Sequence, residues 1–375
     1  MATNTGPLRS YLSGLIFGTV LFGMCYSISS YAAYLIEQSA SSVASGNLRR
    51  SALYDGHLGS QHDRNNSAGA QEHFPQKDVT MMRCPQELDS TIDPGILAKL
   101  DCRKRLPQVI GIGVEKCGTG AMAFFLTSHP SIAHSTPQEI YFWNKHRDKD
   151  LEWYRDQMPV STKYQVTIEK TPSYIFEKDA PERIKASMPD TKFMLLIRDP
   201  IVRAVSDYLH LQSLGLPELL SPRIVPPGYD PLSYLNTTFE GSVIKPNGEV
   251  NTDNGILAHS AYVLYLRRWM KLFPREQFLI LDGDEFAKNP LPGLKQVESF
   301  LGIPHYLNEK FIYFDEQKGF YCKAMLRGRG TICAGATKGR PHPPVDDDVI
   351  RKLRSYFRPY NTQLEDLLGQ RFSWS

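Results

Sequence analysis

The feature that most constrains the fold of this chain is a hydrophobic run that ends in a short polar loop. Residues 109–114 (V-I-G-I-G-V) are apolar and partly β-branched, which predicts a buried strand. Lys116, Gly118 and Thr119 follow in the loop, and residues 121–126 have helical character. A strand, a glycine-containing loop and a helix direct backbone N–H groups at one point, which suits a phosphate or sulfate. An ordinary tight strand–helix connection is the alternative.

This loop is not a Walker A motif. Gly113 and Gly118 have the spacing of the two glycines in that motif, but Thr119 follows directly where the motif requires Lys. Lys116 lies inside the loop, two residues before the second glycine. A nucleotide kinase or hydrolase, one alternative function, would therefore lack the lysine that contacts the β- and γ-phosphates.

A second predicted strand also ends in groups that suit an anion. Residues 192–197 (K-F-M-L-L-I) predict a buried strand, and the R-D-P sequence that begins at Arg198 ends it. The helix that follows carries Ser206. Arginine offers a planar fork of N–H donors and serine a hydroxyl. R-D-P alone is also a common helix start, but two such clusters together indicate a ligand with two anionic groups.

Strand-like and helix-like runs alternate over the last 270 or so residues of the chain, which are enough for one domain. The predicted strands are 108–114, 165–169, 192–197 and 277–281, and the predicted helices are 120–128, 181–188, 200–213, 258–272 and 287–301. This alternation predicts an α/β fold, a single domain with a central parallel sheet flanked by helices. Lys116, Lys170 and Arg198 each follow a strand end, where such folds bind ligands.

The N-terminal third has a different composition. Residues 10–36 are uncharged and rich in apolar residues, and as a helix they would span about 40 Å, enough for a transmembrane anchor. A cleaved signal peptide is the alternative. Arg9 before this segment and Glu37 after it favour a cytoplasmic tail over residues 1–9. Residues 37–104, rich in small and polar side chains, predict a flexible stem, which leaves 105–375 as the folded domain.

From about Leu106 to Trp374 the chain resembles carbohydrate sulfotransferases that use 3′-phosphoadenosine-5′-phosphosulfate (PAPS). The heparan sulfate glucosaminyl 3-O-sulfotransferases are the most similar, followed by the related N-sulfotransferase domain. The segments that carry the resemblance are P-Q-E-I-Y-F-W (137–143), V-T-I-E-K-T-P-S-Y (166–174), L-L-I-R-D-P-I-V-R-A-V-S-D-Y (195–208), L-D-G-D (281–284), K-G-F-Y-C (318–322) and T-K-G-R-P-H-P (337–343). It implies a P-loop-like PAPS-binding sulfotransferase fold that moves sulfate from PAPS to the 3-hydroxyl of glucosamine in heparan sulfate.

The resemblance also assigns roles to residues. Glu139 is implied as the general base that takes the proton of the sugar hydroxyl, and Lys170 as a lysine near the transferred group. Lys116 is implied as the cation that neutralises the bridging oxygen as the nucleotide leaves. The residues implied to bind PAPS are Lys116, Cys117, Gly118, Thr119 and Gly120 in the loop, Arg198 and Ser206 at the 3′-phosphate, and Lys338, Gly339 and Arg340 in a late loop. No metal is expected.

Four positions depart from the 3-O-sulfotransferase pattern on the acceptor side or in the loop. Family members usually have Gly at Cys117 and Arg at Gly120, His at Tyr141, and an acidic residue at Asn144, where Asn is closer to the N-sulfotransferase pattern. PAPS binding is therefore the firmer expectation. An N- or 6-O-sulfotransferase, or a catalytically weakened relative that only binds sulfated glycan, remains an alternative.

We expect a single-pass type II protein of the Golgi membrane with its domain in the lumen, and the cysteines and sequons agree with that location. The resemblance implies a disulfide between Cys322 and Cys333, and Cys84 and Cys102 can pair in the stem. Asn65 and Asn236 begin glycosylation sequons. Cys117 is expected to be a free thiol. The net charge of +3 is no polyanion signature, and nucleic acid is not expected as a partner of a lumenal domain. The resemblance implies heparan sulfate as the acceptor, and the anchor implies the membrane.

Overall fold

The computed structural model of the chain describes residues 81–84, 94–135, 139–214, 238–324, 331–333 and 342–375. The cytoplasmic tail, the predicted anchor over 10–36, most of the predicted stem and both sequons, Asn65 and Asn236, lie outside these residues. Within the described part of the chain, no helix is both long and apolar enough to span a membrane.

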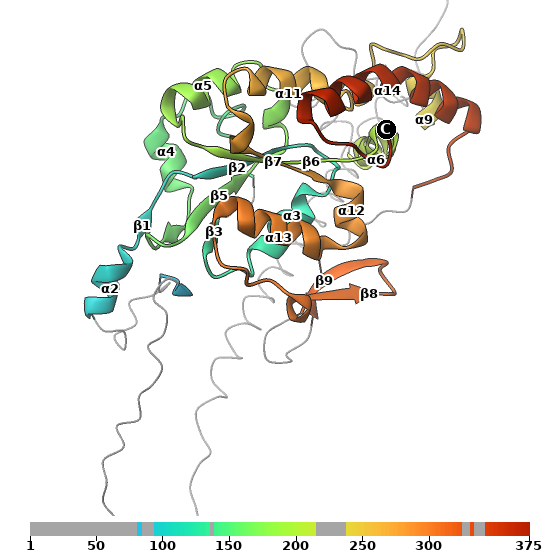
Figure 1. Ribbon diagram of the computed structural model, residues 1–375. Helices are drawn as coiled ribbons and strands as arrows, with labels where there is room; N and C mark the ends of the chain where they lie inside the picture. Colours follow the sequence, from blue (N-terminus) through green and yellow to red (C-terminus); the bar gives the residue numbers. More distant parts are fainter. Residues whose placement is uncertain (1–80, 85–93, 136–138, 215–237, 325–330, 334–341) are drawn as a thin grey trace, which may run out of the picture. The chain divides into compact units, whose positions relative to one another are not determined.

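The centre of the domain is a five-stranded sheet in which all strands are parallel (Figure 1). Its strands, in spatial order, are β3 (Ile132–His134), β5 (Val166–Lys170), β2 (Val109–Gly113), β6 (Lys192–Ile197) and β7 (Phe278–Asp282). β2 is buried along its whole length, as its continuous apolar sequence predicts. Because the chain runs from β2 to one side of the sheet and later to the other, the carboxyl end of β2 lies at the switch point where such folds bind ligands.

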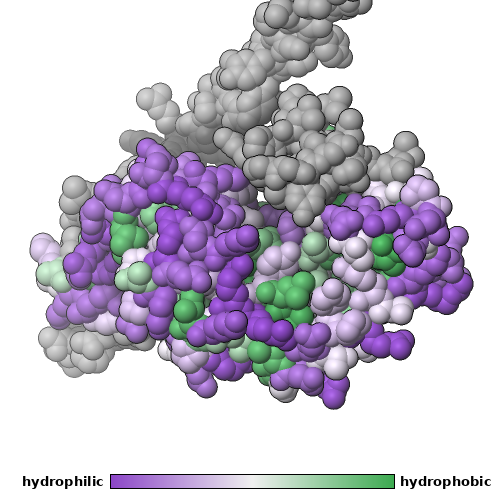
Figure 2. All heavy atoms as spheres, turned by 90° about the horizontal axis from the view of Figure 1, so that it is seen from above, coloured by the Kyte–Doolittle hydropathy of each residue, from purple (hydrophilic) through white to green (hydrophobic). Residues whose placement is uncertain are grey.

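Helices cover both faces of this sheet. In Figure 1, α3 and α13 pack on one face, and α11 and α14 lie on the other. The α-helices are α2 (Pro94–Leu100), α3 (Thr119–Leu126), α4 (Leu151–Asp156), α5 (Ala180–Ser187), α6 (Pro200–Gln212), α9 (Phe239–Val243), α10 (Gly255–Ala258), α11 (Tyr262–Met270), α12 (Gly283–Lys288), α13 (Pro290–Leu301) and α14 (Asp347–Leu368). The face of the domain shown in Figure 2 is mostly hydrophilic, with apolar residues in small separate patches. The apolar sides of the helices supply the core instead.

The predicted α/β architecture is confirmed, and all four predicted strands exist within one or two residues of their predicted bounds. Two predicted helices are each divided in two. The run 258–272 is broken before Tyr262, and the run 287–301 is broken at Asn289, whose side chain caps α13 at the backbone N–H of Leu291 (3.1 Å). Pro290 occupies the first turn of α13, where its missing N–H costs nothing.

Smaller elements complete the domain. β1 (Arg103–Lys104) pairs with β4 (Val160–Ser161), and β8 (Ile312–Asp315), β9 (Phe320–Ala324) and β10 (Thr331–Ile332) form an antiparallel sheet. The 3₁₀ turns whose bounds lie within the described residues are η2 (Tyr174–Phe176), η3 (Arg275–Gln277) and η4 (Glu309–Phe311). The disulfide between Cys322 and Cys333 is present.

Part of the predicted stem belongs to this ordered structure. Arg83 donates to the carbonyls of Thr127 (3.0 Å) and His129 (2.8 Å) just past the end of α3, where a cation is electrostatically favourable. A disulfide joins Cys84 to Cys102. The ordered chain therefore begins upstream of residue 105, because these contacts and the disulfide fix segments whose polar composition predicts no structure.

Candidate active site

A pocket of about 410 Å³ opens at the carboxyl end of the central strands. The loop after β2 lines it with Lys116, Gly118, Thr119 and Gly120, and Arg198 and Ser206 line it from β6 and α6. The remaining wall is largely apolar or aromatic: Ala121, Phe124, Phe125, Leu209, Gly283, Phe286, Ala287, Pro290, Gly319, Phe320, Tyr321 and His342. The two cationic clusters inferred from the sequence therefore meet around one cavity.

The loop after β2 has a backbone that requires glycine and close packing. Gly118 has φ 96° immediately before α3, a conformation that other residues rarely adopt. Gly283 lies against the loop so closely that a Cβ atom there would be 2.4 Å from the carbonyl oxygen of Cys117. The buried Arg203 donates to the carbonyl of Glu115 (3.3 Å) from below. These contacts fix the backbone of the loop, and the N-terminus of α3 faces the pocket.

Cys117 differs from its neighbours in the loop. Its side chain is buried and does not line the pocket, and its Sγ lies 3.7 Å from the hydroxyl of Tyr262. Burial raises the pKa of the Cys117 thiol to about 12, so the thiol stays protonated. The free thiol that the sequence predicts is present, but its side chain belongs to the core, and its backbone N–H donates to the carbonyl of Val114 (3.1 Å).

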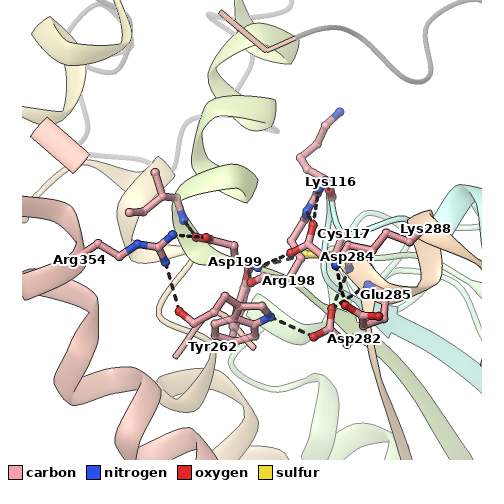
Figure 3. A network of polar contacts seen from close by, with 12 residues as sticks. Lys116, Cys117, Arg198, Asp199, Tyr262, Asp282, Asp284, Glu285, Lys288 and Arg354 are labelled. Carbon is pink, nitrogen blue, oxygen red and sulfur yellow. Dashed lines mark hydrogen bonds and ion pairs between the residues drawn. The ribbon is translucent and has the colours of Figure 1, made fainter. Parts of the chain in front are cut away.

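Arg198 links three loops at the end of the sheet (Figure 3). Its guanidinium donates through Nε (2.9 Å) and Nη2 (2.5 Å) to Oδ1 of Asp284, which follows β7, and through Nη1 to the carbonyl of Lys116 (3.3 Å). The next residue, Asp199, caps α6 at the backbone N–H of Ile201 (2.8 Å). A cap on α6 fixes the helix that carries Ser206 into the same pocket.

Glu139 and Lys170 form an ion pair beside β2, the strand that leads into the loop lining this pocket. Lys170 Nζ lies 2.5 Å from Oε1 of Glu139, and the hydroxyl of Tyr141 donates to Oε2 of the same carboxylate. Lys170 ends β5, the strand beside β2, and its side chain lies across Gly111, where a Cβ atom would be 2.8 Å from Lys170 Cγ. The carboxylate predicted as the general base is therefore beside the strand that leads into the Lys116 loop.

A buried carboxylate holds the segment that carries Glu139. Glu169, fully buried in β5, accepts from Thr171 and from the hydroxyl of Tyr154 (3.1 Å). The hydroxyl of Thr171 in turn accepts the backbone N–H groups of Ile140 and Tyr141 (both 3.2 Å). Burial raises the pKa of Glu169 to about 7. Tyr141 has φ 56°, which this pair of hydrogen bonds helps to maintain.

A second carboxylate near the site, that of Glu115, was not predicted from the sequence. Burial, and after it the charge of Asp207, raises the pKa of Glu115 to about 7, and Arg203 and Lys116 oppose the rise. The charge of Glu139 also raises the pKa of Glu115, and the charge of Glu115 raises the pKa of Tyr141. Its position next to Lys116 was the available signal. Asp284 was not predicted as a site residue either. The signal that could have indicated it is the L-D-G-D segment, which lies at a predicted strand end.

The remaining predicted site residues are not all within the described structure. Lys338, Gly339 and Arg340 lie outside the described residues. Among those described, the one group of side chains spaced for a metal ion is Asp315 with Cys322 and Cys333, and both cysteines are held in the disulfide. The expectation that no metal is needed remains a prediction.

Comparison with known proteins identifies relatives of the whole domain. The family model described as "Sulfotransferase domain" matches residues 106–367. Human heparan sulfate glucosamine 3-O-sulfotransferase 3A1 is 37% identical over 284 residues, which cover 75% of this chain and 66% of that protein. Mouse heparan sulfate glucosamine 3-O-sulfotransferase 5 is 38% identical over 279 residues, 73% of this chain and 75% of that protein. The chain thus spans about two thirds of the length of the first relative.

A solved structure supports the fold. A sulfotransferase from Alicyclobacillus acidocaldarius superimposes with a TM-score of 0.51 at 20% identity, over 72% of this chain and 98% of that one. At this identity the likeness concerns the fold alone.

Proposed function

Because the chain belongs to the sulfotransferase family, and within it to the heparan sulfate glucosamine 3-O-sulfotransferases, we propose that it transfers a sulfuryl group from PAPS to the 3-hydroxyl of a glucosamine in heparan sulfate. The observation that carries the proposal is the place of the Glu139–Lys170 ion pair, beside the strand that leads into the anion loop. A general base and a pocket for an anionic donor are thereby adjacent.

The pocket suits a donor with two anionic groups and a flat base. The loop from Lys116 to Gly120, at the N-terminus of α3, would receive the 5′-phosphosulfate. Arg198 and Ser206, which line the same pocket, would receive the 3′-phosphate. Aromatic side chains on the wall between and around them, such as Phe124 and Tyr321, suit the adenine.

In this proposal the protein contributes position and charge to an in-line displacement. Glu139 accepts the proton of the acceptor hydroxyl while the new bond from oxygen to sulfur forms. The bond from sulfur to the bridging phosphate oxygen breaks, and the electron pair leaves with the nucleotide. Lys116 and Lys170 stabilise the charge that develops on the bridging and sulfuryl oxygens.

The proposal extends to the location of the protein. The apolar segment 10–36 would anchor the chain in the Golgi membrane as a single-pass type II protein, with the domain in the lumen. The two disulfides support an oxidising compartment. Protease protection of the domain in intact microsomes, lost when detergent is added, is the expected result, and cleavage without detergent would contradict it.

The activity is tested with the purified full chain, labelled PAPS and defined heparan, N-desulfated heparan and chondroitin acceptors. Label at the 3-oxygen of glucosamine is the expected result, and Glu139→Gln is the matched inactive control. Label at nitrogen or at the 6-oxygen would replace the proposed position within the same class. Tight binding of the nucleotide and the glycan without transfer would favour the weakened relative, and dependence on ATP and Mg²⁺ would contradict the class.

A further inference from the structure

Asp284 uses both of its carboxylate oxygens at the edge of the donor pocket. Oδ1 accepts the two bonds from Arg198, and Oδ2 accepts the backbone N–H of Asp199 (2.9 Å). The side chains of Arg198 and Asp284 are both about 20% exposed. Since the pair is mostly removed from water, it holds a fixed geometry better than a surface ion pair does.

Asp284 is not required as a helix cap. The start of α12 is capped by Asp282, whose Oδ1 accepts the N–H groups of Asp284 (2.8 Å) and Glu285 (3.2 Å). The side chain of Asp284 is thereby left to contact the R-D-P segment, as Figure 3 shows. Its described hydrogen bonds therefore serve the anion site and not the local helix.

The bonds that Arg198 makes leave part of its guanidinium for a ligand. A guanidinium has five N–H donors. Asp284 takes one on Nε and one on Nη2, and the carbonyl of Lys116 takes one on Nη1. Within the described part of the chain, one N–H on each terminal nitrogen donates to no other residue, and Arg198 lines the pocket. Two such N–H groups match two oxygens of a phosphate.

The C-terminal part of the chain supports the same loops from the side away from the Lys116 loop. Arg354 in α14 donates to Oδ2 of Asp199 (2.6 Å), and Trp374 donates through Nε1 to Oδ2 of Asp282 (3.2 Å). Arg354 also donates to the carbonyl of Trp374 (3.2 Å). The loops after β6 and β7 are thus fixed to each other and to α14.

We propose that Asp284 is a positioning residue that holds Arg198 in the orientation that receives the 3′-phosphate of the donor. The inference rests on the proposed function, since it takes PAPS as the ligand of the pocket. Only a carboxylate satisfies both contacts, because the amide of Asn would place its NH₂ group against either Arg198 or the N–H of Asp199. The opposite role, in which Asp284 competes with the phosphate for Arg198, predicts an effect of opposite sign.

The test compares the binding of 3′-phosphoadenosine 5′-phosphate (PAP) with that of AMP, which lacks the 3′-phosphate, by calorimetry on the full chain. In Asp284→Asn we expect the dissociation constant of PAP to rise about tenfold, because an unordered Arg198 must be immobilised on binding. That of AMP should change less than about twofold. In the background of Arg198→Ala, Asp284→Asn should have no further effect on PAP, because both residues act through one contact.

The matched control is Glu285→Gln, which changes the next residue. Glu285 is 58% exposed and pairs with Lys288 (2.8 Å), so its loss should leave both affinities unchanged. Tighter PAP binding in Asp284→Asn, an equal loss for PAP and AMP, or an additive effect with Arg198→Ala would overturn the inference. A wild-type chain that binds no PAP would instead contradict the proposed function, and the two failures are therefore distinct.

Discussion

The two halves of the candidate site are held in place in different ways. The donor side (Lys116, Arg198, Ser206 and Asp284) joins loops from three strands, and bonds from Arg198 connect all three. The acceptor side, by contrast, comprises Glu139, Tyr141 and Lys170, and the described bonds that hold its loop come from β5 and the residue after it. We infer that changes on the donor side alter nucleotide affinity, whereas changes on the acceptor side alter the rate and the choice of sugar.

The departures that the resemblance implies fall on both sides of this division. Tyr141 contacts the predicted base directly, and Asn144 lies in the same segment and donates to Ser173 (3.0 Å). On the donor side, Cys117 changes a side chain that is buried below the loop. Gly120 is thus the one donor-side departure that lines the pocket, whereas Tyr141 on the acceptor side contacts the predicted base.

The largest expected effect separates the two sides. Glu139→Gln should lower kcat roughly a thousandfold, because an amide cannot take the proton of the acceptor hydroxyl. Its PAP affinity should remain within about twofold of wild type, since Glu139 does not line the donor pocket. Transfer from labelled PAPS and calorimetry with PAP measure the two quantities. A loss of PAP binding would assign Glu139 a structural role and end the division proposed above.

Glu152→Gln is a suitable control for this substitution. It makes the same chemical change at a carboxylate in α4 that is 66% exposed, and it should leave both transfer and binding unaltered.

The reciprocal substitution tests the donor side. Arg198→Ala should raise the KM for PAPS about 30-fold, because it removes charge-assisted bonds to the phosphate, and it should change kcat much less. The acceptor KM, measured at saturating PAPS, is the internal control and should not move. An unchanged KM for PAPS would remove Arg198 from the phosphate site.

A smaller effect is expected at Tyr141, where the acceptor side departs from the pattern that the resemblance implies. Tyr141→Phe removes the hydroxyl that donates to Glu139 but keeps the ring, over which Lys145 Nζ lies 3.4 Å from the centroid. We expect kcat to fall about tenfold. A hydrogen bond donated to a carboxylate favours its ionised form. Without the hydroxyl of Tyr141, the acid limb of the pH–rate profile should therefore shift to higher pH.

The pH–rate profile of Tyr141→Phe must be compared with that of Glu169→Gln. Burial raises the pKa of Glu169 to about 7, so Glu169 also titrates in this range. Burial, and after it the hydrogen bond to Glu139, raises the pKa of Tyr141 itself, and the phenol therefore remains a donor throughout. An acid limb that does not move in Tyr141→Phe would show that Tyr141 does not set the basicity of Glu139.

The sequence predicts the donor side better than the acceptor side, for physical reasons. Buried parallel strands such as β2 and β6 are mostly apolar runs. β6 ends directly before Arg198 and β2 ends three residues before Lys116, so the place of both cations follows from the pattern. The bond between Arg198 and Asp284 joins residues 86 positions apart. No local pattern encodes that distance. The three-residue strand β3 and the 22-residue helix α14 were also missed.

On the acceptor side, the decisive contacts depend on a backbone that periodicity does not describe. Tyr141 has a positive φ although it is not glycine, and Thr171 maintains it from another strand end. The pairing of Glu139 with Lys170 joins residues 31 positions apart. The resemblance to a family supplied the identity of Glu139, but its partners required the fold.

The smallest effect concerns Gly120, which lies in the first turn of α3 and lines the donor pocket, at a position where the family resemblance implies Arg. Gly120→Arg should not reduce stability, because Arg favours helix more than Gly by roughly 0.5–1 kcal/mol. The added cation should raise activity on highly sulfated acceptors about two- to fivefold and make that activity more sensitive to salt. Gly120→Gln, similar to Gly120→Arg in helix propensity but neutral in charge, is the matched control and should match wild type in activity and in salt sensitivity.

If Gly120→Arg and Gly120→Gln act alike, the missing cation does not determine acceptor choice, and the selectivity must be sought in the loop that carries Glu139 and Tyr141. If only Gly120→Arg responds, the donor loop also contributes to acceptor recognition, and the division between the two sides is less strict than the hydrogen bonds suggest.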